Sequence, residues 1–390
     1  MLTQASNTYD YIIAGAGSSG LSLAWHMVRE GLDGKKLLVV DQNLTPENDK
    51  TWCFWEKNRP QFAHLIHRKW LQSDIFVNGD HYHQQLRQYP YYSIRSGHYR
   101  KSILDELQKH PRVTLMESPI RKLSGTETGA GLTCDKGHFQ ADFIFQSCFK
   151  PSLKRKPRYP LVQHFLGWEV TVNTEIFDAD SFVLMDFDET YRQGLAFMYV
   201  LPWSSTSALL EYTIFSKEAE ELPLYEKKLE LYLHNRYGLK RLNYNIDRVE
   251  YGNIPMNDAI HDPWFAPRVL NVGANAGLTK PSTGYAFRRI QQHSRAIVDR
   301  LVTHGKPAPA PRSARRYRNY DLWLLQILHD HPREAQDVFQ QLFKNNTLDE
   351  LFCFLGEESN LREDFKIMKS VPWWPFLRAI WKTRRSLFSF

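Results

Sequence analysis

A glycine-rich run near the start of the sequence contains the residues whose spacing most clearly indicates chemistry. Residues 15–20 read GAGSSG, with Gly15, Gly17 and Gly20 spaced as in a dinucleotide-binding turn. In such a turn the first glycine permits the bend, the second lets the backbone approach a pyrophosphate, and the third lets a helix pack closely on a strand. The following helix would then offer free N–H groups to the phosphates.

Glu211 is the best candidate for acid–base chemistry, because it closes the apolar run 208–210. A carboxyl group against apolar walls is disfavoured as an anion, so its pKa rises and it can serve as a general acid near neutral pH. The alternative is an ordinary surface glutamate on an alternating strand. Glu169 and Asp186 are further carboxylates that could help in proton transfer.

The elements around the glycine run must position a nucleotide. An apolar run at 9–13 predicts a strand, and residues 21–28 follow a helical pattern. A second strand, 36–40, ends in Asp41 at the distance where an acid should hold ribose hydroxyls. A glycine turn in an α/β protein without a nucleotide could imitate one of these features, whereas here they all agree. FAD is favoured over NAD because the motif lies so early in the chain.

Residues 273–277, which read GANAG, predict a second cofactor loop, since small residues before a helix let backbone amides approach a flavin and its pyrophosphate. The alternative is a strand-to-helix turn without a ligand. Residues 281–285 should pack against the isoalloxazine. The expected cofactor-binding residues are Gly15, Ala16, Gly17, Gly20, Asp41, Gly273, Ala274, Gly277, Ser282, Thr283 and Gly284.

The rest of the chain alternates between two kinds of structure. We expect a helix at 98–110, strands from 112 to 149, an irregular connection at 150–158 and a mainly antiparallel sheet over 161–215. An amphipathic helix should follow at 218–237, strand and helix should return at 268–301, and the chain after 311 should be mainly helical. The predicted FAD-binding parts are 1–70, 98–155 and 263–310, the substrate-binding parts are 71–97 and 156–262, and the helical region is 311–390.

Composition excludes several classes of protein. The 390 residues are 42% hydrophobic, as in a globular protein, and 14% aromatic, a surplus that could line apolar pockets. No 18-residue apolar run and no signal peptide are present, so a cytoplasmic location is expected. The net charge is +7, and the basic residues alternate with aromatic residues instead of forming a groove, which argues against nucleic-acid binding.

Metal binding is not expected. The four cysteines have no Cys-x-x-Cys spacing, which argues against a zinc site or a disulfide framework. The pairs His64 with His67 and His81 with His83 lack nearby ligands at convincing spacing and are interpreted as solvated histidines. The acidic run 186–189 lacks the glycine of a calcium loop.

Several blocks, in order, resemble the lycopene cyclase family of bacteria and plants, of the β-cyclase type. They are KTWCFW at 50–55, FLGWEV at 165–170, VLMD at 183–186, residues 198–205, LLEYT at 209–213, GNIPM at 252–256, VGANAG at 272–277 and KPSTGY at 280–285. The resemblance implies an α/β fold in which a Rossmann-like FAD domain of the glutathione-reductase type is interleaved with an antiparallel substrate domain and followed by helices.

The resemblance also implies a reaction. Lycopene, or a related linear carotenoid, would be cyclised through γ-carotene to β-carotene by an intramolecular lyase that needs reduced FAD, with NAD(P)H or an electron-donor reductase as the source of electrons. It marks Glu211 as the proton donor; Tyr212 stands where the family usually has a second acid, so Glu169 or Asp186 could assist. The alternatives are an FAD-dependent monooxygenase, a prenyl-chain reductase, or a carotenoid carrier without catalysis.

The tail 371–390 interleaves Trp and Phe with basic residues, which suits the surface of an anionic membrane. The alternative is a terminal helix that packs its aromatic side chains on the body of the protein. An insoluble substrate favours a peripheral membrane association. The basic residues concerned are Arg378, Lys382, Arg384 and Arg385.

Overall fold

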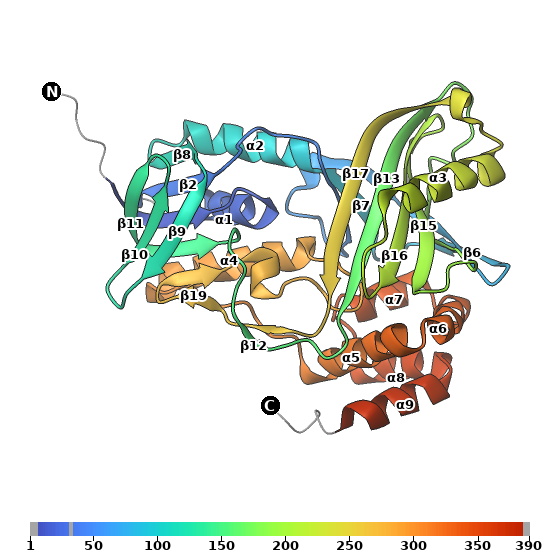
Figure 1. Cartoon of the computed structure of the whole chain (residues 1–390). Coiled ribbons are helices and arrows are strands. Elements are labelled where there is room, and N and C mark those ends of the chain that lie inside the picture. The colour runs from blue at the N-terminus through green and yellow to red at the C-terminus, as the bar shows by residue number, and fades with distance from the viewer. Residues whose placement is uncertain (1–6, 31–33, 385–390) are drawn as a thin grey trace.

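A mixed sheet at one end of the molecule carries the glycine-rich turn (Figure 1). The computed structural model describes residues 7–30 and 34–384. Five neighbouring strands are parallel, in the order β8 (Val113–Glu117), β2 (Leu37–Asp41), β1 (Thr8–Ala14), β11 (Gly137–Gln146) and β20 (Val269–Asn271). The antiparallel strands β9 (Ile120–Gly125), β10 (Ala130–Cys134) and β19 (Trp264–Ala266) complete the sheet.

This sheet is buried on both faces, which explains why its central strands are continuously apolar instead of alternating. Ile13 belongs to a core shared with helices α1 (Ser18–Arg29), α2 (Ser96–Lys109) and α4 (Phe287–His304). Its neighbour Ile12 belongs to a core on the other face, shared with β9 and β10. The predicted α/β fold with a parallel, Rossmann-like core is therefore confirmed.

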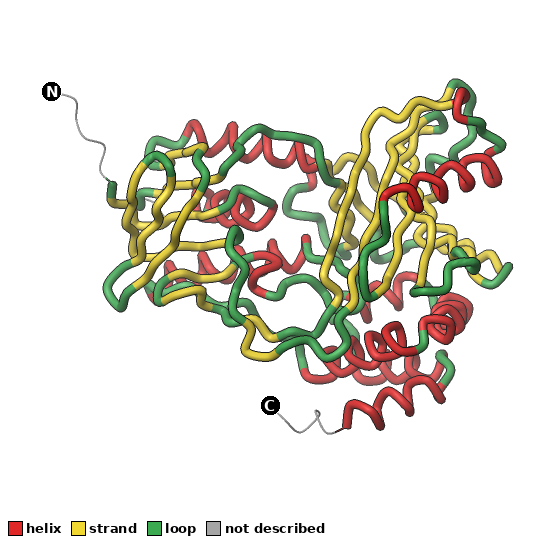
Figure 2. Tube along the Cα trace, viewed as in Figure 1, coloured by secondary structure: helices red, strands yellow, loops and turns green. Residues whose placement is uncertain are grey.

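A second, seven-stranded sheet forms the other half of the molecule (Figure 2). Its order is β17 (Tyr244–Met256), β13 (Leu161–Val172), β16 (Ser207–Ser216), β15 (Leu195–Ser204), β14 (Ser181–Phe187), β5 (Gln72–Val77) and β6 (Asp80–Gln85). All pairs are antiparallel except β14 with β5, which is parallel. The predicted mainly antiparallel sheet is confirmed, with this one parallel pair as the difference.

Two short sheets connect these bodies. Strand β7 (Tyr91–Arg95) lies between β3 (Thr51–Trp55) and β4 (Ile66–Trp70). Strand β12 (Leu153–Arg155) pairs with β18 (Ile260–His261). The sequence predicted an irregular connection or a domain crossing at 150–158. Three of these residues instead form β12, whose partner lies about a hundred residues further along the chain and cannot be inferred from local sequence.

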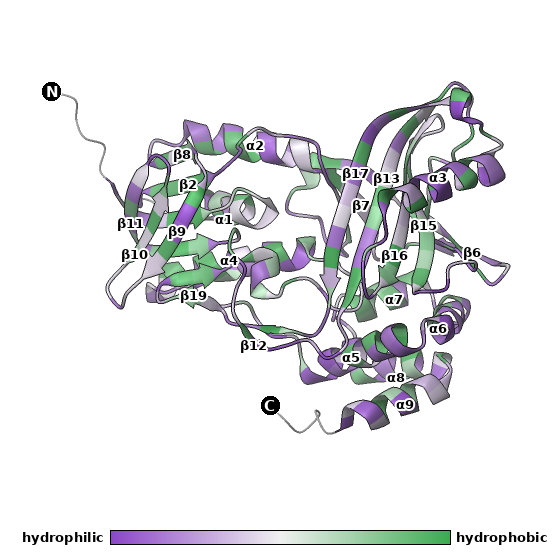
Figure 3. Ribbon diagram, in the orientation of Figure 1, coloured by the Kyte–Doolittle hydropathy of each residue, from purple (hydrophilic) through white to green (hydrophobic). Residues whose placement is uncertain are grey.

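Helices cover both faces of the second sheet. Helix α3 (Leu222–Tyr237) packs on one face, and the helical region packs on the other (Figure 1). The helical region consists of α5 (Arg315–Asp330), α6 (Pro332–Asn345), α7 (Leu348–Leu355), α8 (Leu361–Ser370) and α9 (Trp373–Thr383). Figure 3 shows hydrophobic residues along β15, a central strand of the second sheet, and hydrophilic residues on its edge strand β6. Within the described residues, no helix has both the length and the apolar character needed to cross a membrane.

Candidate functional site

The first turn contains two glycines that the fold itself requires. Gly15 follows β1 with a φ of 106°, a conformation that favours glycine, and its N–H donates to the Val40 carbonyl at 2.8 Å. A Cβ at Gly20 would lie 1.9 Å from the Gly15 carbonyl oxygen. Substitution at Gly20 would therefore separate helix α1 from the turn, as the predicted role in close packing requires.

Gly17 is different, because nothing in the described protein demands a glycine there. Its φ of −75° and ψ of −170° suit any residue, and a Cβ would meet no described atom within 4 Å. Helix α1 starts at Ser18 without a side-chain cap or an acidic residue in its first turn, and the buried Ser18 hydroxyl has no described partner. The free space and uncapped N–H groups fit an anionic group such as a pyrophosphate.

Asp41 lies beside this turn, at the end of β2. Its carboxylate accepts hydrogen bonds from the Ala16 N–H at 2.5 Å and the Asn43 N–H at 3.1 Å. The structure therefore places Asp41 beside Ala16 of the glycine turn. The contact of Asp41 with a ribose stays a prediction.

The second loop packs against the first. Residues Gly273–Ala276 form a 3₁₀ turn that ends at Gly277, and both glycines have positive φ, at 66° and 74°. A Cβ at Gly273 would lie 2.5 Å from the Ser19 hydroxyl at the start of α1. Ala274 lines the large cavity described below. The two predicted cofactor loops are thus neighbours, although 250 residues separate them in the sequence.

The turn at 280–285 is tightly held. The Gly284 N–H donates to the Lys280 carbonyl at 2.9 Å, and Gly284 has a φ of 74°. The buried Lys280 ammonium lies 3.0 Å from Asp321 and 3.1 Å from Glu357. The Ser282 hydroxyl donates to Asp321 at 2.6 Å, so α5 anchors the turn at two points. Because Ser282 is already satisfied by Asp321, it holds the turn in place.

Besides the Ser18 hydroxyl, two polar side-chain atoms of the site have no described hydrogen-bond partner although they are buried. They are the Thr283 hydroxyl and the Gln163 Oε1, and both residues line the cavity. Buried polar atoms are nearly always hydrogen-bonded in folded proteins. These two atoms therefore fit a polar ligand beside the turn, such as the flavin predicted from the sequence.

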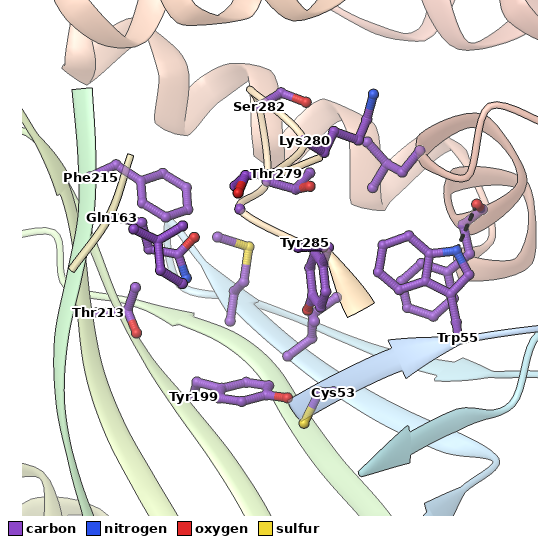
Figure 4. Close-up of a pocket in the computed structure, with 18 of the residues that line it drawn as sticks. Cys53, Trp55, Gln163, Tyr199, Thr213, Phe215, Thr279, Lys280, Ser282 and Tyr285 are labelled. Carbon is purple, nitrogen blue, oxygen red and sulfur yellow. Dashed lines mark hydrogen bonds between the residues drawn. The ribbon is translucent and has the colours of Figure 1, made fainter. Parts of the chain in front are cut away.

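A cavity of about 620 Å³ lies between the turn, the second sheet and the helical region (Figure 4). It extends from Ser18 and Ala274 at the cofactor loops to α8 and α9, which contribute Ile367 and Phe376. Most of the lining is apolar and aromatic. The lining residues that neighbour Glu211 in the chain or in the sheet register are Phe165, Phe197, Tyr199, Leu201, Leu209 and Thr213, and Glu250 lines the cavity two strands away.

Glu211 points into this cavity from β16. It is only 7% exposed, and its one described hydrogen bond comes from the Thr213 hydroxyl at 3.3 Å. Burial, followed by the negative charge of Glu250, raises the pKa of Glu211 well above its ordinary value. Glu211 therefore keeps its proton to higher pH than an exposed glutamate does, and it can present this proton to an apolar molecule.

The other two predicted acids lie elsewhere. Glu169 pairs with Arg95 and, at 2.9 Å, with Arg248, so its carboxylate is fully engaged. Asp186 accepts a hydrogen bond from the Tyr232 hydroxyl of α3 at 2.8 Å, on the opposite side of the sheet. Neither residue lines the cavity. The structure thus brings only Glu211, of the three candidates, to the cavity.

A cluster of hydroxyl and thiol groups was missed by the sequence analysis. The Tyr91 hydroxyl lies 2.8 Å from that of Tyr199 and 2.6 Å from that of Tyr285, and the Cys53 thiol lines the same cavity. Figure 4 shows Tyr199, Cys53 and Tyr285 converging on the cavity from three elements. Burial raises the pKa of each group, so all stay neutral. No local signal marks this cluster, because it forms only when β7, β15 and the turn meet.

The structure does not suggest a metal centre. Among the described residues, no group of three or more His, Cys, Asp or Glu side chains is arranged to bind a metal ion. His81 and His83 instead share Asp74, at 2.7 Å and 3.0 Å. All four cysteines are free thiols.

Comparison with known proteins gives consistent similarities. The family model described as "Lycopene cyclase protein" matches residues 10–381. The chain is 25% identical over 338 residues to a chloroplastic lycopene beta cyclase of an Oncidium hybrid, covering 82% of this chain and 69% of that protein. It is 26% identical over 321 residues to a chloroplastic neoxanthin synthase of Solanum tuberosum, with coverage of 75% and 60%. It is 23% identical to a chloroplastic lycopene beta cyclase of Arabidopsis thaliana, with coverage of 78% and 63%.

The chain therefore spans between 60% and 69% of the length of these relatives. Among solved structures, it matches a geranylgeranyl bacteriochlorophyll reductase-like protein of Thermoplasma acidophilum with a TM-score of 0.62 and 14% identity, covering 98% of this chain and 99% of that one. It matches a flavoprotein/dehydrogenase of Cytophaga hutchinsonii with a TM-score of 0.61 and 11% identity, with coverage of 93% and 96%. At these identities the structural matches support the fold.

Proposed function

This chain belongs to the lycopene cyclase family, and we propose that it converts the ψ end groups of lycopene, or of a related linear carotenoid, into β-ionone rings. The observation that carries the proposal is the position of Glu211. A buried carboxyl group with a raised pKa faces an apolar cavity that also reaches both predicted cofactor loops. This arrangement suits proton transfer to a hydrocarbon, which offers no polar group for binding.

The proposed reaction leaves the oxidation state unchanged. Glu211 donates its proton to the terminal double bond, which produces a tertiary carbocation. The neighbouring double bond attacks this cation and closes the ring. The Glu211 carboxylate then takes up a ring proton, which restores a double bond in the product and the acid in the protein. The product is an isomer of the substrate. Aromatic rings that line the cavity, such as those of Tyr199 and Phe165, favour a cation near their faces.

We propose FAD as the cofactor, held between the two loops and the turn. Three observations support this cofactor: the fold does not require a glycine at position 17, the start of α1 has no side-chain cap, and the buried polar atoms of Thr283 and Gln163 have no described partner. When bound in its reduced, anionic form, the flavin supplies negative charge that stabilises a nearby carbocation in a water-excluded site. NAD(P)H or an electron-donor protein would keep it reduced.

We further propose that helix α9 contacts a membrane surface. On α9, Trp373, Trp374 and Trp381 are 68%, 61% and 63% exposed, whereas Ala379 on the opposite side of the helix is buried. The helix thus packs on the body with one side and leaves aromatic side chains exposed on the other, and these exposed rings support the proposal. Arg384 lies over the Trp381 ring, which suits an anionic interface. Arg385 and the rest of the tail lie outside the described residues.

The predicted division of the chain also remains a proposal. The FAD-binding parts would be 1–70, 98–155 and 263–310, and the substrate-binding parts 71–97 and 156–262. Strands β5 and β6 lie in the second sheet and β8 to β11 in the first, which supports this division.

Expression in a bacterial host that accumulates lycopene tests the function. Conversion to a pigment of unchanged mass with β-ionone rings is expected. A monooxygenase would add oxygen and a prenyl-chain reductase would add hydrogen, so either change of mass would overturn the proposal. A carrier without catalysis would leave the pigment as lycopene.

A further inference from the structure

Glu250 is a second carboxylate that faces the cavity beside Glu211. In the sheet register, Gly167 of β13 lies opposite Glu211 on one side and opposite Glu250 of β17 on the other. Residues in one such row point to the same face of a sheet, and alternate strands lie about 10 Å apart. The two carboxyl groups therefore face each other across a position that has no side chain.

Gly167 keeps this space open. A Cβ at Gly167 would lie 3.1 Å from the Glu211 Cγ and 3.6 Å from its Oε2. The backbone of Gly167 has no positive φ, so the fold does not require a glycine there. The glycine instead leaves Glu211 and Glu250 with no side chain between them, in a site of low dielectric constant where charges interact strongly.

The two carboxyl groups have very different partners. Glu250, 2% exposed, accepts hydrogen bonds from the Thr51 N–H at 2.8 Å, the Thr51 hydroxyl at 2.9 Å and the Arg248 guanidinium at 2.7 Å. Glu211 has only the Thr213 hydroxyl, at 3.3 Å. Donors of this number and charge hold a carboxylate. The site therefore surrounds Glu250 with charged and backbone donors and leaves Glu211 with a single hydroxyl donor.

The arginines near Glu211 form ion pairs with other carboxylates. Arg248 spans Glu169 and Glu250, and Glu169 also pairs with Arg95, so these four residues form an alternating chain of charges. This chain has no net charge. Within it, Glu250 is the member whose negative charge acts most strongly on Glu211.

The remaining groups near Glu211, among them Arg248 and Lys50, offset this effect only in part. The Lys50 ammonium is half exposed and donates to the Tyr251 carbonyl at 3.1 Å, so water and the backbone screen it. Cys53 and Tyr285 are buried, and burial raises the pKa of both groups, so they are neutral. The negative charge of Glu250 is thus the main fixed charge that Glu211 meets.

We propose that Glu250 is a positioning residue for the acid: its fixed charge, acting across the side-chain-free Gly167, keeps the proton on Glu211 until substrate binds. This inference rests on the proposed function of Glu211. After donation, two carboxylates would face each other, so their repulsion favours return of a proton to Glu211 and restores the starting state. The Thr51 contacts also give a structural role to the start of the TWCF segment.

The variant Glu250→Gln removes this charge and keeps the size of the side chain. Its pH dependence is measured in two ways: as kcat for ring formation, and as the infrared band of the protonated carboxyl group of Glu211, which is identified by its absence in Glu211→Gln. In the wild-type protein, activity and band should both be lost as pH rises. In Glu250→Gln, both losses should occur at lower pH, by about one pH unit or more. FAD content should not change.

The variant Glu250→Asp retains the charge but withdraws it by one methylene, so a smaller shift in the same direction is expected. This variant decides the matter if Glu250→Gln does not fold. Identical midpoints in the folded variant and the wild type would overturn the role of Glu250. A shifted infrared band in a protein that forms no ring product would support the coupling of Glu250 to Glu211 and refute the proposed function instead.

Discussion

Replacement of Glu211 by Gln tests the chemistry most directly. The amide has the same size and can still accept the hydrogen bond from the Thr213 hydroxyl, but it cannot deliver a proton. A general acid contributes about 10²- to 10⁴-fold to a rate, which corresponds to about 2.7 to 5.5 kcal/mol of barrier. Because Glu211 alone of the predicted acids lines the cavity, we expect the loss of ring formation to reach at least about 10²-fold.

The same variant should change stability in a pH-dependent way. The pKa of Glu211 is raised in the folded protein above its ordinary value of 4.5, so the folded state binds this proton more tightly than the unfolded state. Wild-type stability is therefore fully retained below about pH 4.5 and falls as pH rises toward the folded pKa. Each unit of pKa displacement corresponds to about 1.4 kcal/mol. Glu211→Gln should lack this decline.

The assay is β-carotene formed per bound FAD, together with urea unfolding across the pH range. FAD binding should stay normal, since the cofactor loops do not include β16. The corresponding amide variants Glu169→Gln and Asp186→Asn provide the comparison, because neither residue lines the cavity. Near wild-type ring formation by Glu211→Gln would refute the assignment, and loss of both flavin and activity would show only a folding defect.

Three further predictions concern the cofactor, its turn and the membrane. Gly17→Val should fold, because its side chain has room, but should not retain FAD; full retention would exclude the assigned site. Lys280→Met should lower the free energy of unfolding by about 3 to 5 kcal/mol, since it leaves Asp321 and Glu357 without their buried cation; an unchanged urea midpoint would contradict this. Replacing the three exposed α9 tryptophans by Ser should reduce sedimentation with anionic vesicles; unchanged binding would exclude this face.

Much of the fold was predictable from the sequence because local patterns of apolar residues and glycines determine its elements. The apolar run at 9–13, the glycine turn and Asp41 correspond to β1, the start of α1 and the end of β2. The parallel pairing of β14 with β5 could not be predicted, because the two strands lie more than a hundred residues apart. The pairing of β12 with β18 was missed for the same reason.

The candidate site was predictable only where the residues next to a side chain in the sequence indicate its environment. Glu211 follows an apolar run, so its burial could be inferred. The partners that define its surroundings could not: Glu250 lies 39 positions later in the chain and meets Glu211 only through the register of β13. Thr51 belongs to a different sheet. Its role appears only when β3 is placed against β17, where it donates two hydrogen bonds to Glu250.

Tyr212 stands where the resemblance to the lycopene cyclase family leads us to expect a second acid. The alternation of side chains between the two faces of β16 explains why a tyrosine fits there. Glu211 and Thr213 face the cavity, so Tyr212 between them points to the other side of the sheet, where its hydroxyl donates to Asp188 at 2.6 Å. An acid at position 212 could not reach a substrate in the cavity, and it would place a second negative charge beside Asp188.

We therefore expect Tyr212→Glu to leave the activity of the Glu211→Gln variant unrestored and to lower stability, because it buries a charge next to a like charge. Tyr212→Phe, the matched control, loses one hydrogen bond and should cost about 1 to 3 kcal/mol of stability while ring formation per folded protein stays unchanged. The measurements are urea unfolding and β-carotene per bound FAD for each variant. Recovery of ring formation in the Tyr212→Glu, Glu211→Gln double variant would show that position 212 can supply a proton, and the division of roles along β16 would then be wrong.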